Sequence, residues 1–321
     1  MAQYKKYFDI GTYTGNGGQY RVGMPTLRGQ GASSGTVANS LRFRSSVSTY
    51  LTRTPSSNSS ATKWTVSLWI KRGAIGAGNY ALFGAQSGTI CTQVYFMSST
   101  ADTLRWYENG GDYQTTQLFR DCSVWSHLVF AYDSTQSTAT DRMKIYLNGV
   151  QIIRFSTQTT VSLNATSIWN ANTQNGVGIA WNTSGVAFGY LDGYMANFYN
   201  IDGQALTPSS FGEYNSDNIW VPKAYSGTYG TNGFYQNYAS GVSPGTDSSG
   251  NNNTFTPTGF NTTTANTTYD IMTDSPVDYL TGSMSTANNA GNYATTSLYE
   301  KSSVLTLSRG NLYWKIGRAH V

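Results

Sequence analysis

The chain has 321 residues, only 11% of them charged, and a net charge of +4 at neutral pH. This length is enough for one large domain or two medium domains with a substantial core. Its lysines and arginines are scattered, which argues against a surface that binds nucleic acid. Its charged first residues are not followed by an apolar core, so they are not predicted to be a secretory signal, and no run of 18 or more apolar residues predicts a membrane-spanning segment.

Glutamate occurs only three times, as Glu108, Glu213 and Glu300, whereas Thr, Ser, Asn, Gly and Tyr are abundant. A chain poor in helix-forming residues and rich in strand and turn residues is predicted to be all-β. Cys91 and Cys122 have no CxxC spacing and no neighbouring histidine that would form a zinc site. Two buried free thiols are favoured over a disulfide, because so large a core needs no cross-link.

Residues 1–37 are rich in Gly, Tyr and Thr, as in GTYTGNGGQY, and could not form a core alone. This composition suits an extended N-terminal arm that lies on another surface. A disordered tail is the equal alternative.

From residue 38 to residue 215 the chain shows short alternating runs separated by turn signals. Residues 65–71 place Val66, Leu68 and Ile70 on one face, and residues 125–132 form a second such run. In KIYLNGV, residues 144–150, an alternating strand meets Asn-Gly, which predicts a type I′ hairpin with Ile145 and Leu147 inward. Residues 189–201 are apolar on both faces, which predicts a buried interior strand. This pattern indicates a sandwich of antiparallel sheets.

Residues 216–300 are rich in Tyr, Asn, Gly and Thr and are predicted to pack on the sandwich or to link it to another part. Residues 301–321 resemble the start of a further β domain. The last six residues, IGRAHV, resemble a translated sequencing adapter, so we expect the natural protein to continue beyond this point.

Three motifs in order, WTVSLWIKRG, WSHLVFAYDSTQSTATDRMKIYLNGVQI and GYMANFYNIDGQALTPSSFGEYN, resemble the laminin G-like, concanavalin A-like lectin/glucanase superfamily. The resemblance covers residues 38–215 and implies a jelly roll of two antiparallel sheets, with ligand sites on the concave face or in rim loops. Together with IWVPKAYSGTYGTNGFYQNY and DSSGNNNTFTPTGF, it looks more particularly like appendage proteins of tailed phages, similar to tail fibres.

No catalytic residues are predicted. Glucanases of this superfamily carry a Glu-x-Asp-x-Glu strand, whereas here the three glutamates lie far apart in the chain. His127, the one candidate base, is predicted to be a structural residue inside the sandwich. The sequence therefore argues against an enzyme.

Calcium is the one cofactor that the resemblance implies, because members of the superfamily often bind it through aspartates and backbone carbonyls. The candidate ligands are Asp133, Asp141 and Asp192. Two departures weaken this interpretation: Ala196 and Arg44 stand where relatives carry acidic residues. The alternative role for all three aspartates is capping of turns.

Carbohydrate binding would use exposed aromatic rings flanked by polar side chains. Two spans, LRWYENGGDYQ and IWNANTQNGVGIAWN, supply such rings, although any of their tryptophans could belong to the core instead; Trp64, Trp69 and Trp125 are predicted to be core residues. The candidate sugar-binding residues are Trp106, Tyr107, Tyr113, Trp169 and Trp181.

These features favour a non-enzymatic adhesion subunit of a phage or extracellular fibre that forms a homo-oligomer and recognises surface carbohydrate. The alternative is a purely structural fibre subunit whose N-terminal arm exchanges strands with a neighbour. A polysaccharide depolymerase that uses aspartates is the weakest hypothesis.

Overall fold

The computed structural model describes Val37, residues 39–76, 78–98, 102–216, 218–239 and 243–260, and the backbone of residues 271–272. The predicted arm up to residue 36, most of the extension beyond residue 260 and the predicted further domain at 301–321 lie outside the described residues. In the part of the chain that is described, no helix is long and apolar enough to cross a bilayer.

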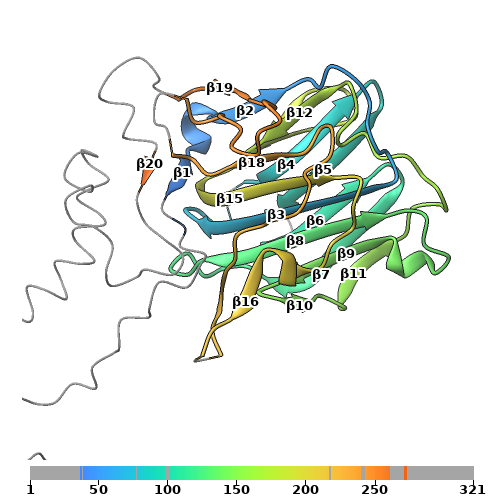
Figure 1. The fold of residues 1–321 in the computed structure, drawn as a ribbon, viewed down its shortest axis with the longest axis horizontal. Coiled ribbons are helices and arrows are strands. Elements are labelled where there is room, and N and C mark those ends of the chain that lie inside the picture. The colour runs from blue at the N-terminus through green and yellow to red at the C-terminus, as the bar shows by residue number, and fades with distance from the viewer. Residues whose placement is uncertain are drawn as a thin grey trace, which may run out of the picture. The chain divides into compact units, whose positions relative to one another are not determined.

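Two large antiparallel sheets form a sandwich, which confirms the predicted all-β jelly-roll class (Figure 1). We call them sheet A and sheet B. Sheet A contains, in order across it, β10 (Val150–Gln151), β9 (Met143–Leu147), β8 (Ser126–Asp133), β3 (Lys63–Arg72), β15 (Gly193–Asp202), β1 (Ser40–Phe43) and β20 (Ile271–Met272), and β18 (Phe234–Gln236) also pairs with β15.

Sheet B contains, in order, β11 (Phe155–Thr159), β7 (Gly111–Leu118), β6 (Thr103–Glu108), β5 (Ile90–Phe96), β4 (Tyr80–Ser87), β12 (Gln174–Val177), β2 (Tyr50–Arg53) and β19 (Thr256–Thr258). Two separate hairpins are β13 (Ile179–Trp181) with β14 (Ala187–Tyr190), and β16 (Gly212–Tyr214) with β17 (Trp220–Pro222). Three short 3₁₀ turns, η1 (Ser45–Val47), η2 (Ala139–Asp141) and η3 (Pro208–Ser210), are the helical elements of the described chain.

The hairpin predicted from KIYLNGV joins β9 to β10. Asn148 and Gly149 have φ values of +47° and +84°, as a type I′ turn requires at both central positions. Ile145 is fully buried and Leu147 packs against the core. Both inward positions that the alternation predicted are therefore confirmed.

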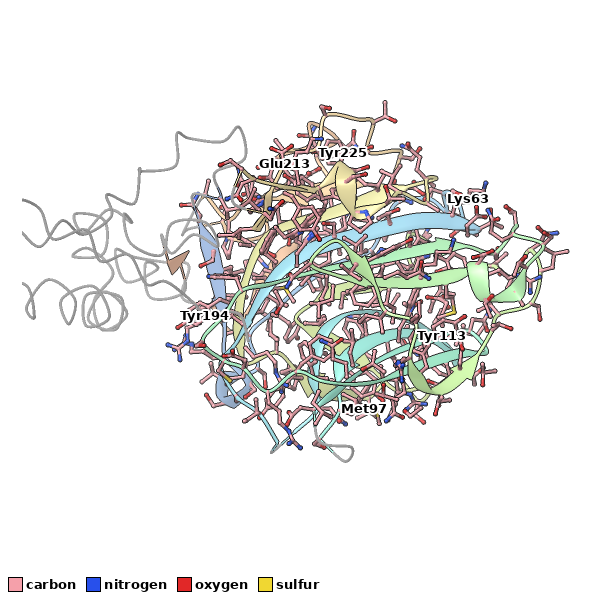
Figure 2. The ribbon with its side chains drawn as sticks, turned by 90° about the horizontal axis from the view of Figure 1, so that it is seen from below. Lys63, Met97, Tyr113, Tyr194, Glu213 and Tyr225 are labelled. Carbon is pink, nitrogen blue, oxygen red and sulfur yellow. The ribbon has the colours of Figure 1, made fainter. Side chains whose placement is uncertain are left out.

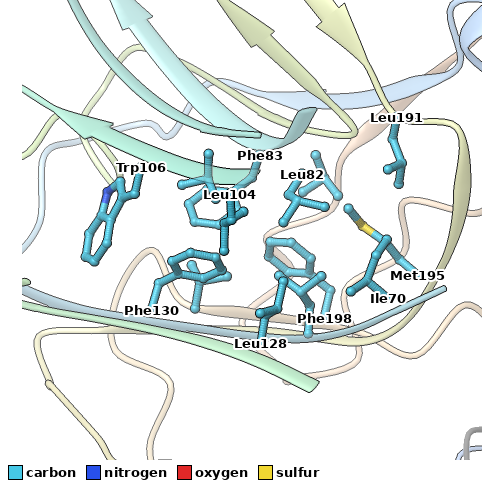
Figure 3. Close-up of a cluster of buried hydrophobic side chains, with 14 of the residues drawn as sticks. Ile70, Leu82, Phe83, Leu104, Trp106, Leu128, Phe130, Leu191, Met195 and Phe198 are labelled. Carbon is cyan, nitrogen blue, oxygen red and sulfur yellow. The ribbon is translucent and has the colours of Figure 1, made fainter. Parts of the chain in front are cut away.

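Side chains fill the space between the two sheets (Figure 2), and aromatic rings from both sheets meet there (Figure 3). Phe83 of β4 and Phe130 of β8 pack edge to face with ring centroids 5.4 Å apart, and Trp106 of β6 meets Phe130 at 5.6 Å. Trp64 stacks on Tyr132 with centroids 5.5 Å apart. Such pairs each add about 0.5–1.5 kcal/mol beyond the burial of their apolar area. The core is therefore built from large, interlocking rings.

The outer face of sheet A is covered by the chain that follows β15. There Tyr199 stacks on Tyr235 with centroids 4.3 Å apart, and Phe211 stacks on Tyr225 at 5.2 Å. The predicted core residues Trp69 and Trp125 are buried on this side, outside the main core. Sheet A is thus apolar on both faces, which explains the continuous apolar run in β15.

The described part of the predicted extension, up to residue 260, adds a strand to each sheet: β18 pairs with β15 and β19 pairs with β2. Its loop is held by Asp247, whose carboxylate accepts hydrogen bonds from the backbone N–H groups of Tyr235, Ser249 and Asn253 at 2.7–2.9 Å. Backbone groups of an irregular segment are satisfied in this way by side chains.

The prediction of one continuous strand over 189–201 is wrong at its start. β14 ends at Tyr190 and belongs to the β13–β14 hairpin, and β15 begins at Gly193. Between them the Leu191 N–H donates to the Gly178 carbonyl and the Asp192 carbonyl accepts from the Gly73 N–H, so the chain leaves one hairpin and enters sheet A. Gly193 has a φ of +150°, which favours glycine.

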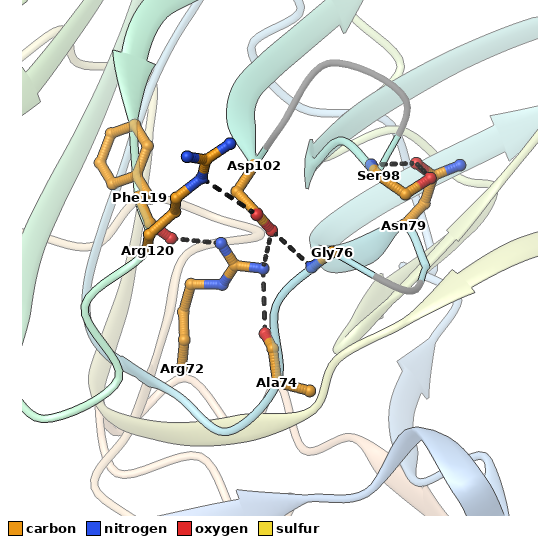
Figure 4. A network of polar contacts seen from close by, with 8 residues as sticks. All are labelled: Arg72, Ala74, Gly76, Asn79, Ser98, Asp102, Phe119 and Arg120. Carbon is orange, nitrogen blue, oxygen red and sulfur yellow. Dashed lines mark hydrogen bonds and ion pairs between the residues drawn. The ribbon is translucent and has the colours of Figure 1, made fainter.

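A buried ion pair joins the end of β3 to the start of β6 (Figure 4). The Arg72 guanidinium donates to the Asp102 carboxylate at 2.8 Å, and both side chains are 4% exposed. Arg72 also donates to the carbonyls of Phe119 and Ala74. Asp102 also accepts from the Gly76 N–H at 2.9 Å. These contacts at the two Nη groups and at the carboxylate offset part of the desolvation cost of the pair.

Both cysteines are free, as expected. Cys91 is buried and Cys122 is half-buried, so the expectation of burial was correct only for Cys91.

Candidate functional site

The outward side of the β6–β7 hairpin carries polar and aromatic side chains in two neighbouring rows. Alternation sends Arg105 and Tyr107 of β6, and Asp112 and Gln114 of β7, away from the core. Cross-strand register places Tyr107 opposite Asp112 and Arg105 opposite Gln114. We call these four residues the polar face.

Arg105 is the centre of the polar face. Its Nε and Nη2 groups donate to the two oxygens of the Asp112 carboxylate at 2.8 and 2.7 Å, and Nη1 donates to the Tyr95 hydroxyl at 2.9 Å. The hydrogen bonds that Arg105 donates to Asp112 raise the pKa of Arg105 above its ordinary value. The guanidinium also lies 5.8 Å from the centre of the Tyr107 ring. This bidentate geometry fixes both charged groups.

The polar face remains open to solvent. The Arg105 and Asp112 side chains are 28% and 22% exposed, and Tyr107 and Gln114 are half-buried. Two of the five guanidinium N–H groups of Arg105 have no acceptor among the described residues. The face therefore offers an aromatic ring beside fixed hydrogen-bond donors and acceptors, a combination suited to hydroxyl groups on a ring.

The β13–β14 hairpin covers the neighbouring part of sheet B. Gln93 of β5 donates to the Trp181 carbonyl at 2.7 Å, and Tyr95 meets Phe188 edge to face with centroids 4.9 Å apart. This hairpin shields the outer side of β4 and β5. The outer sides of β6 and β7 carry the four residues of the polar face.

Of the five predicted sugar-binding aromatics, only Tyr107 is not buried. Trp106, Tyr113 and Trp169 lie inside the sandwich, and Trp181 is buried in the β13–β14 hairpin. The expectation that these four rings are exposed is wrong, because a buried ring has no free face for a sugar. Trp106 and Tyr113 point inward since they alternate with Tyr107 and Asp112 along their strands.

The three candidate calcium ligands are not brought together into one cluster. Asp133 accepts from the Thr135 hydroxyl at 2.6 Å and pairs with Lys63 at 3.4 Å. Asp141 pairs with the lysine three residues later, and Asp192 accepts from the Ser45 hydroxyl at 2.9 Å. Among the described residues, no three His, Cys, Asp or Glu side chains lie close enough to hold a metal ion.

His127 is held by two hydrogen bonds and is fully enclosed. The Trp220 indole N–H donates to Nδ1 at 2.9 Å, so Nε2 carries the proton and donates to the Ser67 hydroxyl at 2.8 Å. Burial lowers the pKa of His127 to about 3. The ring stacks on Trp69 and Trp220, as a structural residue would.

Sequence reasoning missed Arg105, Asp112 and Gln114, although the stretch LRWYENGGDYQ contains all three. The signal was the strict alternation on both sides of the Asn-Gly-Gly turn. Leu104 and Trp106 occupy the positions that face inward, which leaves their neighbours facing outward.

A family profile described as the concanavalin A-like lectin/glucanases superfamily matches residues 45–210. This range is more than half of the chain and contains every described strand of sheets A and B except β1, β18, β19 and β20. The chain belongs to the concanavalin A-like lectin/glucanases superfamily. Within the superfamily domain, the polar face lies on the sheet opposite the one that carries His127.

Several solved structures are similar to this chain at low identity. A native heptameric SAP-like pentraxin from Limulus polyphemus is 16% identical, over 53% of this chain and 79% of its own, with a TM-score of 0.39. Domains LG4-5 of the mouse laminin alpha1 chain are 14% identical, over 65% and 51%, with a TM-score of 0.36. Domain 4 of the arabinanase AbnA from Geobacillus stearothermophilus, in complex with arabinotriose, is 23% identical, over 47% and 65%, with a TM-score of 0.29. A search of curated proteins found no match.

Proposed function

We propose that this chain is a non-enzymatic recognition subunit that binds surface carbohydrate through the polar face of its lectin-like domain. The observation that carries the proposal is the fixed Arg105–Asp112 pair beside the half-buried Tyr107 ring. Sugar hydroxyls both donate and accept hydrogen bonds, and the C–H side of a sugar ring packs on an aromatic face. The polar face supplies partners for all three kinds of contact.

The positions of the Glu and Asp carboxylates favour sugar binding over sugar hydrolysis. Glu108 is fully buried, and Glu213 lies on the β16–β17 hairpin, where it pairs with Lys223 at 3.8 Å. Asp112 is engaged by Arg105 through both oxygens. Glycoside hydrolysis needs two carboxyl groups about 5–10 Å apart around the sugar bond, and the polar face offers one.

A glycan array probed with the full chain tests this proposal. We expect binding to at least one carbohydrate, and we expect Tyr107→Ala to weaken it about tenfold, since an aromatic contact of this kind contributes about 1 kcal/mol or more. The matched control is Tyr146→Ala, which removes a half-buried tyrosine from β9 on the other sheet. Absence of any array signal, with and without added calcium, contradicts the proposal. Release of reducing ends from a bound polysaccharide would contradict the proposal that the chain is not an enzyme.

We propose further that the subunit acts as a homo-oligomer on a virion or extracellular appendage. The support is the resemblance to phage appendage proteins and the low charge of a chain rich in Tyr, Asn and Thr. Light scattering on the full chain and on a version that begins at residue 38 tests the role of the N-terminal segment. An identical oligomer in both rejects strand exchange by that segment, and a monomer in both rejects the homo-oligomer.

A further inference from the structure

We propose that an apolar groove along one side of the sandwich is the surface through which two copies of this chain pair about a two-fold axis. This inference rests on the homo-oligomer proposed above and names its interface. The groove consists of two hollows that share Gln117 and Leu147. The first hollow is lined by Val150 and Ile153, and the second by Leu118 and Val124. We call the two together the apolar groove.

The apolar groove lies where both sheets end. β10 is the last strand of sheet A on this side, and β11 is the last strand of sheet B (Figure 1). Residues 152–154 cross from one sheet to the other: the Ile152 N–H donates to a carbonyl of β9, and the Arg154 carbonyl accepts from an N–H of β7. No described strand pairs with the outer edge of β10 or of β11.

The two edge strands are poorly suited to the addition of a further strand. β10 has only two residues, and the pairing of β11 with β7 shifts register between Phe155 and Thr157. Short edge strands and bulges both disfavour edge-to-edge pairing. We therefore expect a partner to pack on the side chains of the groove rather than to extend either sheet.

Four side chains of the apolar groove are apolar and exposed. Val150 and Ile153 are 62% and 76% exposed, the highest values for large apolar side chains in the described chain, and Leu118 and Val124 are each 46% exposed. Four of the eleven such side chains of the described chain thus line one groove. Single exposed apolar residues are normal, whereas a group of them around one hollow is typical of an interaction surface.

Two opposite charges on the apolar groove have no ionic partner. Arg154 lines only the first hollow and Asp121 lines only the second, so they lie toward opposite ends of the groove. The other charged residues of the lining, Arg72 and Arg120, both pair with Asp102, at 2.8 and 3.7 Å. Arg154 and Asp121 form no ion pair with a described residue.

Asp121 is prepared for a cationic partner. Its Oδ1 accepts hydrogen bonds from the Ser123 N–H at 2.8 Å and from the Ser123 hydroxyl at 2.5 Å, and these bonds lower the pKa of Asp121. Its Oδ2 has no hydrogen-bond donor among the described residues. The carboxylate is therefore charged, oriented and open to a guanidinium group.

A second copy of this chain supplies the matching charges by symmetry. In a two-fold interface every contact occurs twice, because the same surface is used by both copies. With the axis near Leu147, which both hollows share, Arg154 of each copy faces Asp121 of the other. Ile153, the neighbour of Arg154, then enters the second hollow of the other copy. One rotation thus covers the apolar side chains and pairs both charges.

Sedimentation velocity on the full chain at micromolar concentrations tests the proposal. We expect a particle of twice the mass of the chain. Arg154→Asp and Asp121→Arg each place two like-charged pairs in the interface, so each should raise the dissociation constant of the dimer about tenfold or more. The double variant, which exchanges the two charges, should restore the dimer, and so should an equimolar mixture of the two single variants.

Ile153→Asp tests the apolar part of the interface. It places a charge in an apolar hollow twice per dimer, so it should raise the dissociation constant about a hundredfold. The matched control is Val186→Asp, which changes an exposed β-branched side chain on the β13–β14 hairpin and should leave the dimer intact. All four positions are exposed, so circular dichroism should show a folded chain in every variant.

The outcomes separate this interface from the proposed function. A chain that is monomeric at every concentration overturns both the interface and the homo-oligomer, and leaves the groove to a different protein. An oligomer whose mass is unchanged in Ile153→Asp and in both charge variants overturns the interface alone. Loss of the dimer in the single charge variants without rescue by the double variant or by the mixture overturns the two-fold pairing. Binding on the glycan array is measured separately and depends on none of these results.

Discussion

Glu108 lies fully buried inside the sandwich, and its replacement by glutamine should change how stability depends on pH. Burial raises the pKa of Glu108 from 4.5 to about 7, although hydrogen bonds from the side chains of Ser167, Thr92 and Trp106 act in the opposite direction. The Thr92 hydroxyl lies 3.0 Å from Oε1, and the Trp106 indole nitrogen lies 3.5 Å from Oε2. Glu108→Gln keeps the shape of the neutral acid and removes the titration.

The sign of the effect follows from proton binding. Between pH 4.5 and pH 7 the folded chain keeps the proton on Glu108 while the unfolded chain releases it, so the stability of the wild type falls as pH rises through this window. Since one pKa unit corresponds to about 1.4 kcal/mol, the total loss is about 3 kcal/mol. Above about pH 8 the loss is complete, and the contribution of this group no longer changes.

The assay is urea unfolding followed by tryptophan fluorescence at pH 4, 5, 6, 7 and 8, for the wild type and for Glu108→Gln. The free energy of unfolding of the variant, minus that of the wild type, should rise by about 3 kcal/mol from pH 4 to pH 8, because the contributions of other groups cancel in this difference. Glu213→Gln is the matched control, since Glu213 is 42% exposed and paired with Lys223 at the surface. Its difference should change by less than about 1 kcal/mol.

A difference that stays constant across this range would refute the reasoning, because it would mean that Glu108 titrates alike in the folded and unfolded chains. A difference that falls with pH would also refute it. That result would require the ionised form to be the one that the folded protein stabilises.

Two more predictions concern other buried groups. Asp102→Asn keeps the shape of the side chain but leaves the Arg72 charge unpaired. The free energy of unfolding, measured with urea, should therefore fall by about 3–5 kcal/mol. A loss below about 1 kcal/mol would show that the pair is not desolvated. Burial raises the pKa of the Cys91 thiol to about 11. Iodoacetamide at pH 8 should therefore modify half-buried Cys122 well before Cys91, and mass spectrometry of the peptides measures both rates. Equal rates would contradict the burial of Cys91.

The fold could be predicted from the sequence because its signals are local. Alternation over a few residues assigned Val66, Leu68 and Ile70 to one face, and all three lie in the main core. The Asn-Gly pair at 148–149 specified its own turn through the φ values that the turn demands. The family resemblance then supplied the jelly-roll arrangement of two antiparallel sheets, which alternation alone does not determine.

The candidate site was harder to predict, because it depends on which face of each strand is covered. Trp106 and Tyr107 are neighbours in a strand, so they cannot both face the same side. Treating the aromatic residues of LRWYENGGDYQ as one group ignored this rule, and the rule alone would have selected Tyr107 together with Arg105 and Asp112. Alternation does not predict the burial of Trp181, because that burial depends on the β13–β14 hairpin folding over β4 and β5.

The buried hydrogen bonds around Asn170 could not be predicted from the sequence, because they connect residues far apart in the chain. Asn170, Asn200 and Asn232 are separated by about thirty residues each, and nothing local distinguishes them from the many other asparagines. Seven of the ten non-glycine residues with positive φ in the described chain are asparagines, so this residue type supplies most of the non-glycine left-handed positions there.

Many asparagines of this chain have a structural role, because their side chains form hydrogen bonds with the backbone of loops. Asn253 donates to the carbonyls of Thr231 and Gly233, and Asn251 donates to those of Gly230 and Gly233, so both amides satisfy irregular backbone. An asparagine whose amide is used in this way has little left to offer a ligand. Asn170 differs because its oxygen is bonded to Asn200 while its buried nitrogen has no acceptor among the described residues.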